Sequence, residues 1–591
     1  MARTQRRTVA FFNGLGLGLA HALLFGVGFP PAGLILASML SVVPLIVAGV
    51  TTRRPVRTAL GVWLGAMPAW LFYQWWMRDV TAAGMPVLVV HLSMYPALFV
   101  LLVAWLEGAT KRVPIWIGAG VCWAGLEFLR GHILWTGYPW YLIAQPSIAW
   151  PSGRLGGSLI GMFGMGLVFA LLAGAVARVI LLERRRRNPS LLRRLAPLLA
   201  MSLLLGVLSL PWRAWLEPMG LPARASERSV RVALIQTNVP QSNREAWTGD
   251  QRVRALDEFA TLTAQAAAMD PKPDLIVWPE TMFPGPLGLP ASVREDQPDP
   301  SELSRSADWR AQVMLLNRFA IDRVVAMQRE AGVPLMVGSS ALPGFTWTWN
   351  TDRSAIEYET GERFNSVFLI DGGVVRDERY DKQHLAPFGE VMPYISAWPW
   401  LERQLLAFGA QGMTFDLSAG GAPTVLEAGG VRMATPICFE AVIPRVCRGL
   451  VWNADGRRAD VLINMTNDGW FGESWGGRWA HAMCARWRAV ELGVPVLRAA
   501  NTGISGGFDG FGRTLVTGPD DAGPIDSTNV AGVVVVDVAL IEDGAFGRPL
   551  AARLGEGPGW LAFGGTLVLA LIGLRRRSKE QRGVHELHPA L

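Results

Sequence analysis

The sequence predicts a fold in two parts: an α-helical transmembrane bundle of eight spans, and an α/β domain inserted before the last span. Composition is the first indication. Hydrophobic residues make up 51% of the 591 residues and charged residues only 17%, which is too apolar for a soluble enzyme and too charged for a pure membrane bundle. Long uncharged segments also dominate the first part of the chain. Short β-branched runs and helical stretches alternate after it.

The transmembrane prediction rests on apolar segments long enough to cross the hydrocarbon core, which takes about 20 residues. Seven such segments lie in residues 1–212, and an eighth lies in residues 557–577. The predicted spans are 9–27, 32–50, 59–76, 85–105, 113–129, 159–182, 196–212 and 560–574. The first span is not expected to be a cleavable signal peptide, because another span follows at once and no small-residue cleavage site comes before it.

Basic residues predict how these spans are oriented. They cluster before the first span, in the loops after the second, fourth and sixth spans, and after the eighth. The clusters are Arg3, Arg6 and Arg7; Arg53, Arg54 and Arg57; Lys111 and Arg112; Arg184 to Arg187 with Arg193 and Arg194; and Arg575 to Arg577. If all eight spans are real, every cluster falls on one side, which the positive-inside rule makes cytoplasmic. Both termini, including the tail 578–591, are therefore predicted to be cytoplasmic, and residues 213–556 to lie across the membrane. The net charge of +7 comes in these clusters, so it does not indicate nucleic acid as a partner.

Residues 213–556 are predicted to form the α/β domain. The predicted strands are "VRVALIQTNV", "DLIVWPE", "PLMVGSS", "NSVFLIDGGVV", "VRMATPICFE", "ADVLINMTND", "VPVLRAANTG" and "VAGVVVVDV", and the predicted helices are 251–269, 309–331 and 477–492. Strands that alternate with helices predict a sheet covered by helices. Residues 285–306 and 342–360 are predicted to be long loops, a class that often serves as lids or binding loops.

Three predicted strand ends carry groups suited to covalent catalysis: Glu280 in "LIVWPETMFP", Lys382 in "RYDKQHLAPFGE" and Cys438 in "MATPICFEAV". In an open α/β sheet, active sites are built at the carboxyl ends of strands. A free thiol is mostly protonated at neutral pH, so it needs a base, and the Glu280 carboxylate would serve. The Lys382 ammonium and the backbone N–H groups after Cys438 would stabilise an oxyanion.

Each of these residues also has an ordinary structural explanation. A buried cysteine at a strand end is more often a small core residue than a nucleophile. A carboxylate at a helix N-terminus is favoured by the helix dipole, and a loop lysine is usually a solvated charge. His384 and His481 are candidates for acid–base catalysis, but a single histidine is more often a surface or hydrogen-bonding residue.

The cysteines do not predict a metal site or a cofactor. Their spacing contains no CxxC or Cys/His metal pattern, and nothing in it favours a disulfide between Cys447 and Cys484. The four cysteines are Cys122, Cys438, Cys447 and Cys484.

The wording and order of four motifs resemble the nitrilase, or carbon–nitrogen hydrolase, superfamily. They are "WPE", "YDKQHLAPFGE", "PICFE" and "NMTNDGWFG", and the resemblance covers residues 231–538. It implies an αββα sandwich and a catalytic triad of Glu280, Lys382 and Cys438.

The whole chain resembles one branch of that superfamily, the apolipoprotein N-acyltransferase family. That resemblance implies an enzyme of the bacterial inner membrane with a periplasmic catalytic domain. The enzyme would move an acyl chain from a phospholipid, by the family's rule phosphatidylethanolamine, through a Cys438 thioester to the N-terminal amine of a diacylglyceryl-cysteine lipoprotein. No metal or organic cofactor is implied, since the thioester keeps the acyl group reactive.

The resemblance also implies supporting or substrate-binding residues. It assigns such a role to Glu390 through the motif "FGE", to Glu440 through "CFE", and to Trp247 through "NVPQSNREAW". Phe439 stands where the best-known members have Tyr, which leaves an aromatic packing role without the hydroxyl.

Two other functions stay open at this point. A membrane-tethered amidase or nitrilase would turn over small amides without a lipid donor. A scaffold or transporter would lack the chemistry, although the intact triad and the few charges within the spans argue against it. Two segments also have open roles: residues 342–360 are a candidate lid, and residues 392–409 would either guide acyl chains or pack on the sheet as an amphipathic helix.

Overall fold

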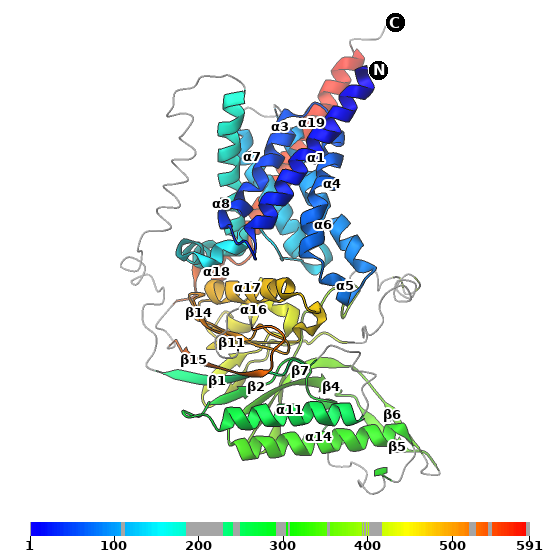
Figure 1. Ribbon diagram of the computed structural model, residues 1–591, viewed down its shortest axis with the longest axis vertical. Helices are drawn as coiled ribbons and strands as arrows, with labels where there is room; N and C mark the ends of the chain where they lie inside the picture. Colours follow the sequence, from blue (N-terminus) through cyan, green and yellow to red (C-terminus); the bar gives the residue numbers. More distant parts are fainter. Residues whose placement is uncertain are drawn as a thin grey trace. The chain divides into compact units, whose positions relative to one another are not determined.

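The computed structural model describes residues 2–586, except 108–112, 185–227, 240–248, 291–302, 305–307, 352–354, 393, 395–397, 399, 401–416, 519–526 and 542–546. The chain divides into two compact units (Figure 1). Unit 1 comprises Met1–Trp215 with Pro549–Leu591, and unit 2 comprises Leu216–Arg548.

Helices are the regular secondary structure of unit 1, and its described residues contain no β-strand. Its α-helices are α1 (Ala2–Gly28), α2 (Ile35–Leu40), α3 (Val42–Thr51), α4 (Pro55–Tyr73), α5 (Met77–Val80), α6 (Gly84–Leu106), α7 (Ile115–Phe128), α8 (Pro151–Arg184), α18 (Leu550–Leu554) and α19 (Gly557–Glu586). Within the described ranges, four segments are long and apolar enough to cross a membrane: Arg7–Gly28, Gly84–Leu106, Pro151–Leu182 and Gly557–Arg575.

The eight-span arrangement stays a prediction. The second predicted span corresponds to the shorter apolar segment Ile35–Thr51. The third and fifth predicted spans correspond to helices α4, of 19 residues, and α7, of 14 residues. The seventh predicted span, 196–212, lies outside the described residues.

Helices α1 and α4 pack through small residues. A Cβ on Gly61 would lie 2.2 Å from the carbonyl oxygen of Phe11, so the two backbones approach closely only because glycine stands there. Such small-residue contacts are typical of helix pairs in membranes. Large apolar side chains face outward, including Leu23 at 68% exposure and Leu561 at 77%. Water would disfavour such a surface, whereas lipid chains would cover it.

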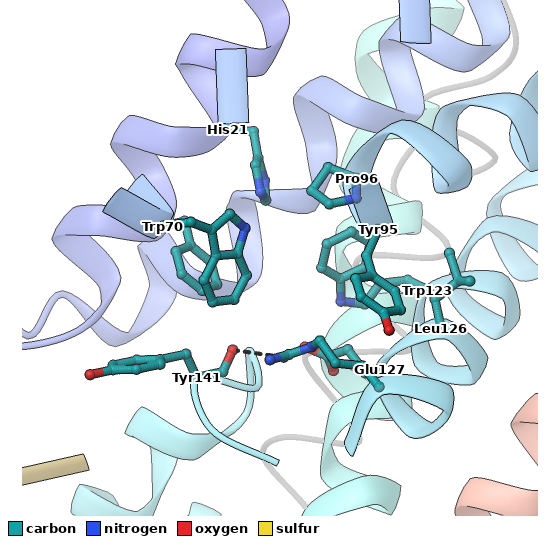
Figure 2. Close-up of a pocket in the computed structure, with 10 residues that line it drawn as sticks. His21, Trp70, Tyr95, Pro96, Trp123, Leu126, Glu127 and Tyr141 are labelled. Atoms are coloured by element: carbon teal, nitrogen blue, oxygen red, sulfur yellow. Dashed lines mark hydrogen bonds between the residues drawn. The ribbon is translucent and has the colours of Figure 1, made fainter. Parts of the chain in front are cut away.

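A polar centre lies inside unit 1, where side chains from helices α1, α4, α6 and α7, together with Arg130 and Tyr141, line a cavity of about 20 Å³ (Figure 2). The buried Arg130 donates to the carbonyl oxygens of Trp140, at 2.7 Å, and Tyr141, at 3.2 Å. Glu127 Oε1 accepts from the backbone N–H of Ile143 at 2.9 Å. These hydrogen bonds pair backbone carbonyl and N–H groups of a segment that lies outside α-helix. Unpaired backbone groups are costly within a membrane, so such partners are required there.

Unit 2 contains two β-sheets and a small hairpin. The first sheet has the order β15-β1-β2-β4-β7-β8, with β3 paired to β4. Its strands are β1 (Ser229–Gln236), β2 (Leu275–Val277), β3 (Pro286–Gly288), β4 (Leu335–Ala341), β7 (Phe364–Asp371), β8 (Val374–Asp381) and β15 (Gly532–Ala539). The second sheet has the order β14-β13-β12-β11-β10-β9. Its strands are β9 (Leu426–Ala428), β10 (Val431–Ala434), β11 (Val461–Thr466), β12 (Val496–Ala500), β13 (Gly506–Phe508) and β14 (Thr514–Thr517).

Helices cover the outer faces of both sheets, which gives the four layers of an αββα sandwich (Figure 1). Helices α11 (Gly249–Ala267) and α14 (Trp309–Ala331) cover the first sheet, and α16 (Pro444–Val451) and α17 (Trp475–Leu492) cover the second. The core under α11 and α14 includes Phe259 stacked on Trp278, with ring centroids 4.3 Å apart. The β-branched runs of the sequence form strands because two-sided burial favours such side chains.

Three sequence predictions about local structure need correction. Residues 285–306 are not a loop throughout, because β3 pairs with β4 in their described part. Residues 342–360 are not a plain loop, because β5 (Thr346–Trp349) and β6 (Ile356–Glu359) pair as an antiparallel hairpin. The alternation Thr-Trp-Thr-Trp suits a strand, since β-branched and aromatic side chains favour pleated backbone. "NSVFLIDGGVV" is not one strand but two, β7 and β8, because Gly372 and Gly373 adopt positive φ and turn the chain back.

Candidate active site

Three chain segments of unit 2 bring the predicted triad together. Glu280 follows β2, and Lys382 follows β8 directly, both in the first sheet. Cys438 follows β10 of the second sheet and begins the 3₁₀-helix η7 (Cys438–Val442). Each residue therefore lies just beyond the carboxyl end of a strand, where the sequence predicts it.

Lys382 lies between two carboxylates. Its side chain is 1% exposed, and its Nζ lies 3.5 Å from Glu280 Oε1 and 2.8 Å from Glu390 Oε2. Burial alone would lower the pKa of Lys382, but the carboxylates of Glu390 and Glu280 together raise it above its ordinary value. The ammonium therefore stays charged at neutral pH, as a group that stabilises an oxyanion must.

Both carboxylate oxygens of Glu280 are fixed by neighbours. Asn365 Nδ2 donates to Oε1 at 2.8 Å, and the backbone N–H of Asn467 donates to Oε2 at 2.9 Å. Asn365 also lies 3.5 Å from Glu390 Oε1. A carboxylate that accepts these bonds has a fixed orientation, which a base requires.

Cys438 is half-buried and has a backbone φ of +49°, in the left-handed region that favours glycine. Such strain costs of order 1–3 kcal/mol and occurs often at functional sites. Burial raises the pKa of the Cys438 thiol, Glu280 raises it further, and Lys382 and a hydrogen bond with Thr466 lower it. The resting thiol is therefore protonated, and thiolate chemistry needs a nearby base.

Glu440 ties the Lys382 segment to the Cys438 turn. Its buried carboxylate accepts from the backbone N–H of Ile437 at 2.8 Å, Gln383 at 2.7 Å and His384 at 2.9 Å, and from the Tyr380 hydroxyl. Burial raises the pKa of Glu440 to about 7, while these bonds oppose that shift. Glu440 therefore contacts the backbone on both sides of the site, whereas Glu390 binds the Lys382 ammonium itself.

The remaining predicted residues have different outcomes. The Phe439 ring stacks on His384, with centroids 6.0 Å apart and an interplanar angle of 15°. Burial, Arg445 and Lys382 lower the pKa of His384 to about 4, so this histidine is neutral at physiological pH. Trp247 lies outside the described residues. Cys447 and Cys484 are buried thiols that are not joined in a disulfide.

Several polar residues at the site were not assigned by the sequence. Thr466, Asn467 and Asp468 lie within the motif "NMTNDGWFG", so the motif indicated their region but not their contacts. Asn365 is the first residue of the predicted strand "NSVFLIDGGVV" and gave no signal of its own. In the described part of the chain, no cluster of three or more His, Cys, Asp or Glu is placed to hold a metal ion.

Comparison with known proteins places this geometry in a family. Residues 231–539 match the carbon–nitrogen hydrolase family, and residues 21–175 match the apolipoprotein N-acyltransferase N-terminal domain. The apolipoprotein N-acyltransferase of Bordetella bronchiseptica is 31% identical over 601 residues, which cover 95% of this chain and 96% of that protein. The chain belongs to the apolipoprotein N-acyltransferase family.

Another relative and two solved structures extend the comparison. The apolipoprotein N-acyltransferase of Geobacter metallireducens is 27% identical over 577 residues, with 95% of each chain covered. An amidase from Nesterenkonia sp. has a TM-score of 0.32 at 19% identity, covering 54% of this chain and 93% of the amidase. A carbon–nitrogen hydrolase from Helicobacter pylori G27 has a TM-score of 0.33 at 14% identity, covering 53% of this chain and 89% of that one.

Membership of the apolipoprotein N-acyltransferase family agrees with the two-unit organisation. The N-terminal match falls in unit 1, which supplies the long apolar helices, so the chain is a membrane protein. The carbon–nitrogen hydrolase match falls in unit 2 and contains Glu280, Lys382 and Cys438.

Proposed function

We propose that this chain is an apolipoprotein N-acyltransferase that works through a thioester on Cys438. It takes an acyl chain from a phospholipid, phosphatidylethanolamine by the family resemblance, and gives it to the N-terminal amine of a diacylglyceryl-cysteine lipoprotein. One observation carries this proposal. A buried ammonium lies between two carboxylates, and the charges of Lys382 and Glu280 both act on a thiol in a strained turn.

In the first step, Glu280 accepts the proton of the Cys438 thiol, and the thiolate attacks the ester carbonyl carbon of the phospholipid. The carbonyl electrons move onto oxygen, where the Lys382 ammonium and backbone N–H groups after Cys438 stabilise the negative charge. The carbon–oxygen bond to the glycerol then breaks. Glu280 returns the proton to the departing alkoxide, so lysophospholipid leaves and the thioester remains.

In the second step, the lipoprotein's amine attacks the thioester carbonyl. Such an α-amine has a pKa of about 7.7–8.0, so roughly a tenth to a sixth of it is already unprotonated at pH 7. Glu280 takes the extra proton from the nitrogen, the carbon–sulfur bond breaks, and the thiolate recovers that proton. The products are the amide and the resting enzyme, which predicts ping-pong kinetics.

We also propose that the enzyme resides in the bacterial inner membrane, with residues 213–556 in the periplasm and both termini in the cytoplasm. The alternating positions of the basic clusters support this orientation. The N-terminal amine of an exported lipoprotein would then lie on the same side as the triad. A cysteine-accessibility scan with a membrane-impermeant thiol reagent tests the orientation. Labelling of residues 213–556 only in broken cells would contradict it.

Mass spectrometry of the purified full-length protein tests the thioester directly. After incubation with phosphatidylethanolamine in mixed micelles, we expect an acyl adduct on Cys438 that hydroxylamine removes. Cys438→Ala should lose both adduct and transfer, while Cys122→Ala, which changes a buried thiol of unit 1, should keep both. A wild-type protein that hydrolyses small amides without lipid and never forms the adduct would favour the tethered amidase instead.

A further inference from the structure

A buried polar cluster lies against the backbone of the nucleophile. It consists of Thr466, Asp468, His481 and Arg498, each at most 1% exposed. His481 Nδ1 lies 3.0 Å from Asp468 Oδ1, and its Nε2 lies 3.0 Å from the carbonyl oxygen of Cys438. Thr466 donates to the same Asp468 oxygen at 2.8 Å, and Arg498 forms an ion pair with the other oxygen.

The contacts of His481 show which of its ring nitrogens donates to the Cys438 carbonyl. Burial by itself would raise the pKa of Asp468, but Arg498 and His481 lower it to about 2, so Asp468 is an ionised acceptor. Nδ1 of His481 lies against this carboxylate and 3.3 Å from Nη2 of Arg498. Because a carbonyl oxygen can only accept, Nε2 carries the hydrogen that His481 donates to Cys438.

The Cys438 carbonyl has a second donor, Asn464 Nδ2, at 3.3 Å. Two side chains from different elements, β11 and α17, thus hold one carbonyl. The Cys438–Phe439 peptide is trans and planar, so its N–H points away from its C=O. Fixing the carbonyl toward His481 therefore fixes the Phe439 N–H on the opposite side of the peptide.

We propose that His481 is a positioning residue, which orients the Cys438–Phe439 peptide so that the Phe439 N–H meets the oxyanion formed at the Cys438 thioester carbon. This inference rests on the proposed acyl transfer and adds a residue to it. The Asp468–Arg498 pair holds the imidazole ring at Nδ1, and the strained φ of Cys438 makes such anchoring necessary.

The test compares a reaction that forms an oxyanion with one that does not. Acylation of the full-length protein by p-nitrophenyl hexanoate passes through an oxyanion, whereas alkylation of Cys438 by iodoacetamide does not. We expect His481→Leu to slow acylation about 100-fold, the loss typical of a misplaced oxyanion donor, and to leave KM and the alkylation rate nearly unchanged. His481→Gln, whose amide still donates one hydrogen bond, should recover about tenfold of that loss.

Met483→Ala is the matched control, since it removes a buried side chain from the same helix without touching the Cys438 carbonyl. It should leave the acylation rate within about twofold. The inference is overturned if the His481 variants acylate at the wild-type rate, or if acylation and alkylation fall by the same factor. If His481→Leu does not fold, His481→Gln decides alone: slower acylation at unchanged alkylation supports the inference, and any other result overturns it. p-Nitrophenyl hexanoate acylates the enzyme without any phospholipid, so the His481 test does not depend on the proposed donor. A wild-type enzyme that reacts with this ester but not with phosphatidylethanolamine would contradict the proposed donor, and the comparison of His481 variants would remain valid.

Discussion

Replacing Lys382 by methionine would remove the central charge of the site while keeping the side-chain length. At an effective dielectric constant of 20, the ammonium attracts Glu390 at 2.8 Å and Glu280 at 3.5 Å by roughly 6 and 5 kcal/mol, before the cost of desolvation. Folding has already removed much of the water from these groups, so Lys382→Met leaves the buried Glu280 and the partly buried Glu390 without a counter-charge. Removing one partner of a buried ion pair typically destabilises a protein by about 3–5 kcal/mol.

The assay is thermal unfolding of the full-length protein in detergent, followed by tryptophan fluorescence across a pH series. Unit 2 runs from Leu216 to Arg548, and for a unit of this size 3–5 kcal/mol lowers Tm by roughly 4–7 °C. The pKa of Lys382 is raised in the folded protein, so the stability that its charge contributes is fully present below the ordinary lysine pKa and is lost only as the pH rises above it. The difference from the wild type should therefore persist across neutral pH and shrink only at strongly alkaline pH.

The double variant Lys382→Met/Glu390→Gln is the decisive comparison. Neutralising Glu390 removes one of the unpaired charges, so the double variant should be more stable than Lys382→Met alone at neutral pH. If Lys382→Met is as stable as the wild type, or if the second substitution lowers stability further, the electrostatic reasoning is wrong.

Three further predictions concern neighbouring contacts. Glu440→Gln should lower the free energy of unfolding by about 1–3 kcal/mol, because the amide NH₂ faces buried backbone donors; calorimetry would reveal it, and unchanged stability would argue against the role of Glu440 as a link. Asp468, whose pKa falls from 3.8 to about 2 on folding, should contribute about 2 kcal/mol that is present above pH 4 and lost as the pH falls towards 2. The Tm of Asp468→Asn should therefore depend less on pH between 4 and 2 than the Tm of the wild type. Equal dependence of the two Tm values on pH would contradict the shift. Arg130→Met should destabilise unit 1 by about 3–5 kcal/mol, because it removes the positive charge beside the buried Glu127 and the donor to the Trp140 and Tyr141 carbonyls. Val87→Ala, at a side chain that is 68% exposed, is the control. Equal melting temperatures for the two variants would refute the prediction.

The sequence predicted the strand ends that bear Glu280 and Cys438 because buried strands are rich in β-branched and apolar residues. Lys382 follows β8, a mostly exposed strand of charged residues that such a pattern does not mark. The sequence failed at residues 342–360, where a Pro, Gly and Asn composition indicated a loop although the Thr-Trp alternation forms a strand. It also left open which of Glu390 and Glu440 holds Lys382. The structure shows that Glu390 binds the ammonium and that Glu440 binds backbone N–H groups.

The sequence by itself determined the classes of element and the chemical groups: apolar helices long enough for a bilayer, alternating strands and helices, and a carboxylate, an ammonium and a thiol at strand ends. These follow from local composition and periodicity, which a single segment carries. Only the tertiary structure decided the contacts. Asn365 reaches Glu280 across 85 residues of chain, and His481 reaches the Cys438 carbonyl across 43. Hydrogen bonds between distant segments depend on how sheets and helices pack, and no local pattern records that packing.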